Sequence, residues 1–255
     1  MTWGGLRPVR NHPERSGLIT EVITLPGRFN GPPRSGNGGY VSGRLARYLT
    51  GPAASVRLRV PPPLDQALRV EAAGDEASLF DGDTLVAQAR RIDFELAPPA
   101  APTFAEAEAA SKTAYAGFAR HPLPHCFVCG PGRAEGDGLR IFPGRTEDEG
   151  VLAAPWVPHA SLDDGAGLAA KEFLWAALDC AGAFAVMEDL EQPIILGELS
   201  ARLDRKLAIG EPAVVVAWPL GIDGRKRFAG TALYSAAGMP IASARATWIV
   251  LRDAS

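Results

Sequence analysis

The sequence has few cysteines, no long apolar run and no excess of charge of one sign. Its 255 residues include three cysteines, and no apolar, signal-like segment opens the chain, so we expect a reduced, cytoplasmic protein. The longest apolar run, 173–187, is interrupted by Asp179 and is too short to span a bilayer. The formal net charge is −3, and basic and acidic side chains nearly balance in both halves. Neither nucleic acid nor a membrane is therefore an expected partner.

The composition is that of a globular protein rich in turns. Hydrophobic residues make up 47% and charged residues 22% of the chain, which excludes general disorder. The 28 glycines and 22 prolines predict many turns but lack the collagen period. The length allows one large domain or two smaller ones, and a chain of this size needs no disulfide or metal for stability.

The same order of elements is predicted twice. In the first half a strand, a loop and a helix are followed by three strands, at 18–25, 28–39, 40–49, 55–60, 68–73 and 84–96. In the second half a strand and a helix are followed by four strands, at 151–156, 168–190, 194–203, 213–218, 227–235 and 240–251. The pair Asp223-Gly224 predicts a hairpin turn within the second set.

An alignment of the halves indicates an internal duplication. It places 68–70 opposite 213–215, 87–90 opposite 242–245, and Gly38-Gly39 opposite Ala181-Gly182, with Asp179 opposite Gly36. Proline clusters bound the segment 97–124, which contains a helical pattern at 103–119 and is typical of a linker. We therefore predict an N-terminal unit at 1–110, a linker at 111–130 and a C-terminal unit at 131–255.

The predicted architecture is α+β, with curved antiparallel sheets that each wrap around a central helix. A helix followed by alternating strands favours an antiparallel sheet with the helix packed on one face. The second helix is apolar nearly all round, from Phe173 to Val186, which indicates that it is enclosed.

Three segments resemble hotdog-fold acyl-CoA thioesterases, and the resemblance extends from about residue 16 to 251. The first is Asn37-Gly38-Gly39-Tyr40. The second runs from Cys126-Phe-Val-Cys129-Gly130-Pro131 to Gly138-Leu139-Arg140-Ile141, and the third is Trp175-Ala-Ala-Leu-Asp179-Cys180-Ala-Gly182. The resemblance implies a tandem (double) hotdog, in which two units of one chain replace the usual homodimer. It also implies hydrolysis of an acyl thioester at the interface of the two units.

The start of the first helix is the candidate electrophilic site. Free backbone N–H groups at a helix N-terminus can polarise a thioester carbonyl, and glycines let the substrate approach. By resemblance, Asn37, Gly38 and Gly39 occupy this position, with Gly36 and Tyr40 beside the substrate. The alternative for Asn37 is an ordinary N-cap. The resemblance also implies that Asn30, in the preceding loop, orients the water or the acyl carbonyl; the alternative is a plain Asn-Gly turn.

Asp179 is the candidate general base. A carboxylate in an apolar helix is costly unless it is paired, and burial raises its pKa into a useful range. The alternative is a structural acid that caps a neighbouring loop. Trp175, one turn earlier, is a candidate substrate contact. Arg225 and Lys226 follow the Asp223-Gly224 turn and could hold coenzyme A phosphates, or be solvated surface cations.

No metal and no cofactor besides the coenzyme A part of the substrate is expected. His121, His125, Cys126 and Cys129 form an HxxxHCxxC pattern, but four-ligand zinc sites usually separate two ligand pairs by a dozen or more residues. Cys180 has no histidine near it in sequence and is a weak candidate nucleophile. Asp163 and Asp164 are most simply solvated turn residues.

The leading hypothesis is a thioesterase that hydrolyses an acyl-CoA or a related acyl thioester. A non-catalytic acyl-CoA-binding or interaction protein is one alternative. A hotdog hydratase or dehydratase is another, although neither His12 nor His159 lies in the context that those enzymes use. Two such chains could also associate into a homodimer of two-unit chains.

Overall fold

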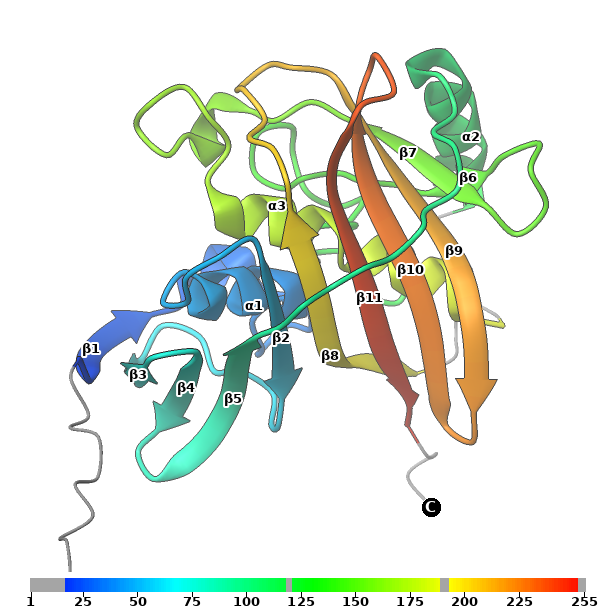
Figure 1. Cartoon of the computed structure of the whole chain (residues 1–255). Coiled ribbons are helices and arrows are strands. Elements are labelled where there is room, and N and C mark those ends of the chain that lie inside the picture. The colour runs from blue at the N-terminus through cyan, green and yellow to red at the C-terminus, as the bar shows by residue number, and fades with distance from the viewer. Residues whose placement is uncertain (1–16, 118–120, 189–192, 252–255) are drawn as a thin grey trace, which may run out of the picture.

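The fold is α+β, with one large antiparallel sheet that curves around a small group of helices (Figure 1). The computed structural model describes residues 17–117, 121–188 and 193–251. Within these ranges eleven strands form one sheet in the order β1-β3-β4-β5-β2-β8-β11-β10-β9-β7-β6. His12 and the last two residues of the helix predicted at 168–190 lie outside the described residues.

Two sets of elements follow one another along the chain. The first set is β1 Ile19–Thr24, a 3-10 turn Gly27–Phe29, α1 Gly38–Ala46, β2 Ala53–Leu58, β3 Ala67–Ala73, β4 Glu76–Asp81 and β5 Thr84–Arg91. After α2 Phe104–Gly117 comes the second set: β6 Gly144–Arg145, β7 Leu152–Trp156, a 3-10 turn Ala160–Leu162, α3 Lys171–Ala177, α4 Cys180–Val186, β8 Ile194–Leu203, β9 Ala213–Asp223, β10 Lys226–Ser235 and β11 Pro240–Val250.

The strand order repeats in the two halves, as the sequence predicts. From one edge of the sheet to its middle the order is β1-β3-β4-β5-β2. From the other edge to the middle it is β7-β9-β10-β11-β8, and the short β6 lies outside β7. The halves join where β2 pairs with β8, with Ser55 opposite Ser200. The Ser200 hydroxyl lies 2.9 Å from that of Ser55, and Glu198 accepts from Arg57 at 2.6 Å.

Two sequence expectations differ from the structure. Strand β4, with sequence EASLFD, was not predicted, because it is short and half polar and lies between turns at Gly74 and Gly82. The helix predicted over 168–190 is broken into α3 and α4. Thr231 Oγ1 donates to the Leu178 carbonyl at 2.8 Å, which takes that carbonyl away from the helical ladder at the break.

The correspondence of the two helices also corrects the sequence alignment. In each half a 3-10 turn and an isolated bridge precede the helix, Asn30 with Gly36 and Asp163 with Ala169, a shift of 133 residues (163 − 30 and 169 − 36). The counterpart of Gly38 is therefore Lys171, the first residue of α3. The alignments of Gly38-Gly39 with Ala181-Gly182, and of Asp179 with Gly36, are wrong.

Helices α1 and α3 pack at close range because α1 carries glycines where they touch. A Cβ on Gly39 would lie 2.7 Å from the Trp175 carbonyl oxygen, and one on Gly43 would lie 2.5 Å from Glu172 Cα. Gly39 thus meets the end of α3 and Gly43 meets its start, so the two helices run antiparallel. Their contact brings the start of α1 to the break between α3 and α4.

The outer face of the second half is covered by the segment between the two sets. After β5 the chain crosses the sheet to α2 (Figure 1), and Tyr234 Oη of β10 donates to the Pro99 carbonyl at 2.7 Å. Helix α2 packs against β6, β7 and β9. It extends across residue 110, and the unit limits at 110 and 130 stay predictions.

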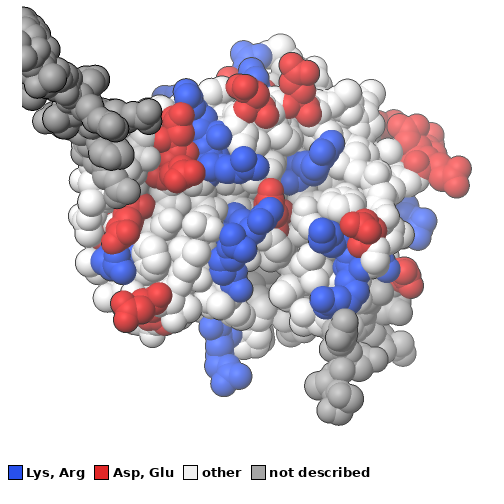
Figure 2. Space-filling model, turned by 60° about the horizontal axis from the view of Figure 1, so that its bottom comes forward, with Lys and Arg blue, Asp and Glu red and all other residues white. Residues whose placement is uncertain are grey.

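Basic and acidic side chains are interspersed on the surface in Figure 2, without a continuous patch of one sign on that face. This agrees with the balanced charge of the sequence. None of the helices in the described part of the chain is long and apolar enough to cross a membrane.

Candidate active site

The carboxylate of Asp179 lies at the start of α1. Asp179 is 2% exposed and occupies the break between α3 and α4. Its Oδ2 accepts one hydrogen bond from the Gly39 backbone N–H and another from Asn37 Nδ2, each at 2.8 Å. Asn37 is also the N-cap of α1, since its Oδ1 accepts from the Tyr40 N–H at 2.9 Å. One asparagine therefore fixes both the helix start and the carboxylate.

The environment of Asp179 favours its protonated form. Burial raises the pKa of the carboxyl to about 7, although the hydrogen bond from Gly39 opposes the rise. Asp179 Oδ1 is buried and has no hydrogen-bond partner among the described residues. Such an orphaned oxygen is costly in a structural role and is free to accept a proton or a hydrogen bond from a ligand.

A cavity of about 350 Å³ adjoins this carboxylate. Both halves and the intervening loop line it. The polar and small lining residues include Gly36, Asn37, Gly38 and Asp179, and the apolar ones include Leu58, Leu123, Ile194, Leu196 and Ile249. The Gly38 N–H takes part in no hydrogen bond found among the described residues. The cavity thus combines an open N–H donor and a carboxylate with an apolar wall.

Trp248 of β11 is a site residue that the sequence did not reveal. Trp248 lines the cavity, and its Nε1 is buried without a partner among the described residues. A buried tryptophan N–H usually has an acceptor. The alternation of β11 marks Trp248 as inward-facing, but only the three-dimensional structure shows that it reaches the same cavity as Asp179.

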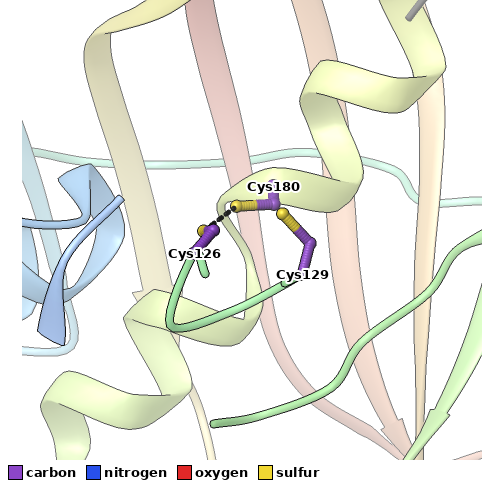
Figure 3. Close-up of side chains that lie close together, drawn as sticks. All are labelled: Cys126, Cys129 and Cys180. Carbon is purple, nitrogen blue, oxygen red and sulfur yellow. Dashed lines mark hydrogen bonds between the residues drawn. The ribbon is translucent and has the colours of Figure 1, made fainter. Parts of the chain in front are cut away.

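The three cysteines gather beside Asp179. Cys126 and Cys180 line the cavity, and the sulfur atoms of Cys126, Cys129 and Cys180 lie within 4.8 Å of one another (Figure 3). Hydrogen bonding from the Cys129 and Cys180 side chains lowers the pKa of the Cys126 thiol, whereas the same contacts with Cys126 raise the pKa of its two partners. The sequence could not show that Cys180 joins the other two.

Of the predicted site residues, Gly36, Asn37, Gly38 and Asp179 meet at the cavity. Gly39 is not among the lining residues, and its N–H donates to the Asp179 carboxylate. Asn30 does not join them, because its Nδ2 donates to the Gly31 carbonyl and its Oδ1 accepts from Arg133. These contacts support the Asn-Gly turn and leave no free polar group to orient water.

The other predicted substrate contacts do not line the cavity. Tyr40 is buried in an aromatic cluster with Phe29 and Phe173, and Trp175 is buried between α1 and the sheet. Arg225 and Lys226 lie exposed at the β9–β10 hairpin. The cation that does line the cavity is Arg59 of the loop after β2.

The two histidines of the HxxxHCxxC pattern do not join the cluster of cysteine sulfurs in the described part of the chain. His121 Nδ1 accepts from the Leu123 N–H, and His125 is exposed at a different hollow, beside Pro124. Asp163 and Asp164 accept hydrogen bonds from the backbone of their own loop, as solvated turn residues do.

Comparisons with known proteins rest on structure, since no family model and no curated protein sequence matches the chain. The tesB protein of Mycobacterium avium subspecies paratuberculosis superposes with a TM-score of 0.58 at 12% identity, covering 94% of this chain and 95% of that one. The acyl-CoA thioesterase II TesB2 of Mycobacterium marinum superposes with a TM-score of 0.57 at 8% identity, covering 92% and 94%.

A protein of unknown function with a hot dog fold from Alicyclobacillus acidocaldarius also matches, with a TM-score of 0.54 at 9% identity and 95% coverage of both chains. These likenesses extend over nearly the whole of each chain, which confirms the resemblance predicted from the sequence at the level of fold. The chain therefore has an α+β hotdog fold similar to that of TesB-type thioesterases.

Proposed function

We propose that this protein is a double-hotdog thioesterase, which hydrolyses an acyl-CoA or a related acyl thioester in the cavity between its two halves. The observation that carries the proposal is the position of Asp179. Its carboxylate comes from the second half but is bound by Gly39 and Asn37 of the first half. The repeated strand order supports two hotdog units, and the fold of the TesB-type neighbours agrees with this function.

Asp179 acts as the general base. Its Oδ2 is fixed by two donors, which leaves Oδ1 as the oxygen that takes a proton from water. The resulting hydroxide attacks the thioester carbonyl carbon. The tetrahedral intermediate then expels the thiolate, which takes the proton back from Asp179, so the products are a carboxylic acid and a free thiol and the base is regenerated.

The start of α1 stabilises the oxyanion. Gly38 lines the cavity and its N–H has no partner in the described chain, so it can donate to the carbonyl oxygen as negative charge develops. The Gly39 N–H already binds Asp179 and holds the base instead. The sequence predicts that both glycine N–H groups polarise the carbonyl; we assign that role to the Gly38 N–H alone.

The remaining cavity wall suits an acyl chain. Leu58, Ile194 and Ile249 line it, and Arg59 stands at the same wall. Arg59 is exposed, and its Nη2 donates to Gln88 at 2.9 Å, so its guanidinium can also face solvent. We assign it, ahead of Arg225 and Lys226, to the phosphates of coenzyme A.

The test is thiol release from a panel of acyl-CoA chain lengths by wild type and by Asp179→Asn. The substitution keeps the size and the acceptor oxygen but removes the base, so kcat should fall by about 10²- to 10⁴-fold. Asp83→Asn is the matched control, because Asp83 is exposed on the β4–β5 turn, and it should leave kcat unchanged.

Full turnover by Asp179→Asn would contradict the assignment of the base. Binding of acyl-CoA without thiol release by the wild type would favour a binding module instead. A change in enoyl absorbance without thiol release would favour a hydratase.

A further inference from the structure

All three cysteines of the chain converge on one point. Cys126 and Cys129 come from the loop before β6, and Cys180 is the first residue of α4. Figure 3 shows the three sulfur atoms turned toward one another from these two segments. They lie within 4.8 Å of one another, Cys126 Sγ and Cys180 Sγ are 3.7 Å apart, and all three thiols are free and buried.

The spacing of the sulfurs matches one face of a tetrahedral zinc site. A Zn–S bond of about 2.3 Å at tetrahedral angles places ligand sulfurs about 3.8 Å apart. The Cys126–Cys180 distance of 3.7 Å already has this value. The limit of 4.8 Å on the remaining pairs means that a contraction of at most about 1 Å completes the triangle.

The backbone holds the sulfurs in these positions. The Gly130 N–H donates to the Cys126 carbonyl at 2.9 Å, and a Cβ on Gly130 would lie 2.5 Å from that carbonyl oxygen. This tight turn presents Cys126 and Cys129 together. The Phe127 N–H donates to the Asn30 carbonyl at 2.8 Å, which anchors the turn to the first half.

The surroundings also favour bound thiolates over simple packing. Asn37 Nδ2 lies 3.8 Å from Cys180 Sγ, where its N–H can support a thiolate ligand as outer-shell donors do. Buried cysteines can pack as small hydrophobic groups, but packing alone does not require two distant segments to bring three sulfurs together.

We propose that Cys126, Cys129 and Cys180 bind one zinc ion as thiolates. Each thiol gives up its proton on binding, so three thiolates and Zn²⁺ leave one negative charge in place of three. Water supplies the fourth ligand, because Cys126 and Cys180 also line the cavity. The ion ties the loop before β6 to α4, and therefore to the segment that carries Asp179.

The pattern His121, His125, Cys126 and Cys129 is too short in sequence to surround an ion by itself. The fold supplies the third thiolate from α4, and the two histidines are not needed. His125→Ala is therefore an informative control, since it should leave zinc binding unchanged.

The test measures metal directly in the reduced full-length protein. We expect one equivalent of zinc per chain by elemental analysis after purification without chelator. Cobalt added after removal of zinc should give a thiolate-to-cobalt charge-transfer band, and the band must come from these residues because the chain has three cysteines in all. The absence of both zinc and the cobalt band would overturn the proposal.

Cys126→Ser, Cys129→Ser and Cys180→Ser should each weaken zinc affinity at least about tenfold, and His125→Ala should not. Loss of the cobalt band in His125→Ala, or its full retention in all three serine variants, would also overturn the proposal. If a serine variant does not fold, the wild type decides: zinc should protect all three thiols from a thiol reagent, and a chelator should expose them. None of these measurements depends on turnover, so they succeed or fail independently of the thioesterase proposal.

Discussion

Replacing Gly39 with alanine adds a methyl group where α1 meets the α3–α4 break. The new Cβ would lie 2.6 Å from Asp179 Cβ and 2.7 Å from the Trp175 carbonyl oxygen, and a backbone atom cannot rotate away. Overpacking of this kind costs about 1–3 kcal/mol, and alanine recovers about 1 kcal/mol of helix propensity. Loss of the N–H bond to the Asp179 carboxylate costs a further ~1.5–3 kcal/mol. The expected net loss of stability is roughly 1.5–5 kcal/mol.

Gly43→Ala is the matched control for this substitution. Its Cβ would lie 2.5 Å from Glu172 Cα, so it crowds the same helix pair without touching Asp179. It should cost roughly 0–2 kcal/mol by the same reckoning. Urea unfolding measures both losses, and thiol release measures kcat, which should fall at least about tenfold in Gly39→Ala alone because the base is displaced.

Equal losses of stability and of kcat in the two variants would refute the reasoning. The bond from Gly39 to Asp179 would then have no separate energetic or catalytic role. A wild-type free energy of unfolding in Gly39→Ala would refute the close helix contact itself.

Three further predictions concern other contacts. Asn37→Asp keeps an acceptor for the Tyr40 N–H but replaces the donor to Asp179 with a second carboxylate. The activation free energy of thiol release should therefore rise by more than the free energy of unfolding falls. Burial raises the pKa of Glu198, but hydrogen bonds from Arg57 and Ser55 outweigh it and lower that pKa overall. The contribution of Glu198 to stability is therefore present above its unfolded pKa and lost as pH falls through the folded value. Glu198→Gln should cost under about 1 kcal/mol at pH 7 in urea unfolding, and this cost should shrink as the pH falls through the folded pKa of Glu198. Tyr234→Phe removes the hydroxyl that donates to Pro99 and should cost about 1 kcal/mol in the same assay.

Strands were predictable where a burial pattern or a turn marked them. The Asp223-Gly224 hairpin joins β9 and β10 where the sequence places it, with Gly224 at a positive φ of 56°. Strand β4 lacked such a pattern, since its alternation is brief and polar at both ends. The break at Asp179 was also hidden, because the hydroxyl that takes the Leu178 carbonyl belongs to Thr231 in a distant strand.

The site shows the same limit at the level of single residues. The N-cap of Asn37 and the unusual position of Asp179 follow from local sequence, because a cap needs a short polar side chain and an apolar helix seldom carries a carboxylate. The hydrogen bond between Asn37 and Asp179 does not follow from local sequence, because only the packing of α1 on α3 brings the two residues together. Trp248 and Cys180 reach the cavity for the same non-local reason.

The two ends of the α1–α3 helix pair carry different residues in the described part of the chain. At the start of α1, Asn37-Gly38-Gly39 faces Asp179. A shift of 133 residues (163 − 30), set by the paired bridges, places Ala170-Lys171-Glu172 at the start of α3 and Ala46 opposite it. There the N-cap lacks a side-chain hydrogen bond, and the Glu172 carboxylate instead pairs with Arg47 at 3.3 Å. A lysine and a glutamate thus stand where α1 has two glycines, and the buried glutamate is held in an ion pair. The arrangement that we propose for thioester hydrolysis is therefore present at the start of α1, and the described residues do not repeat it at the start of α3.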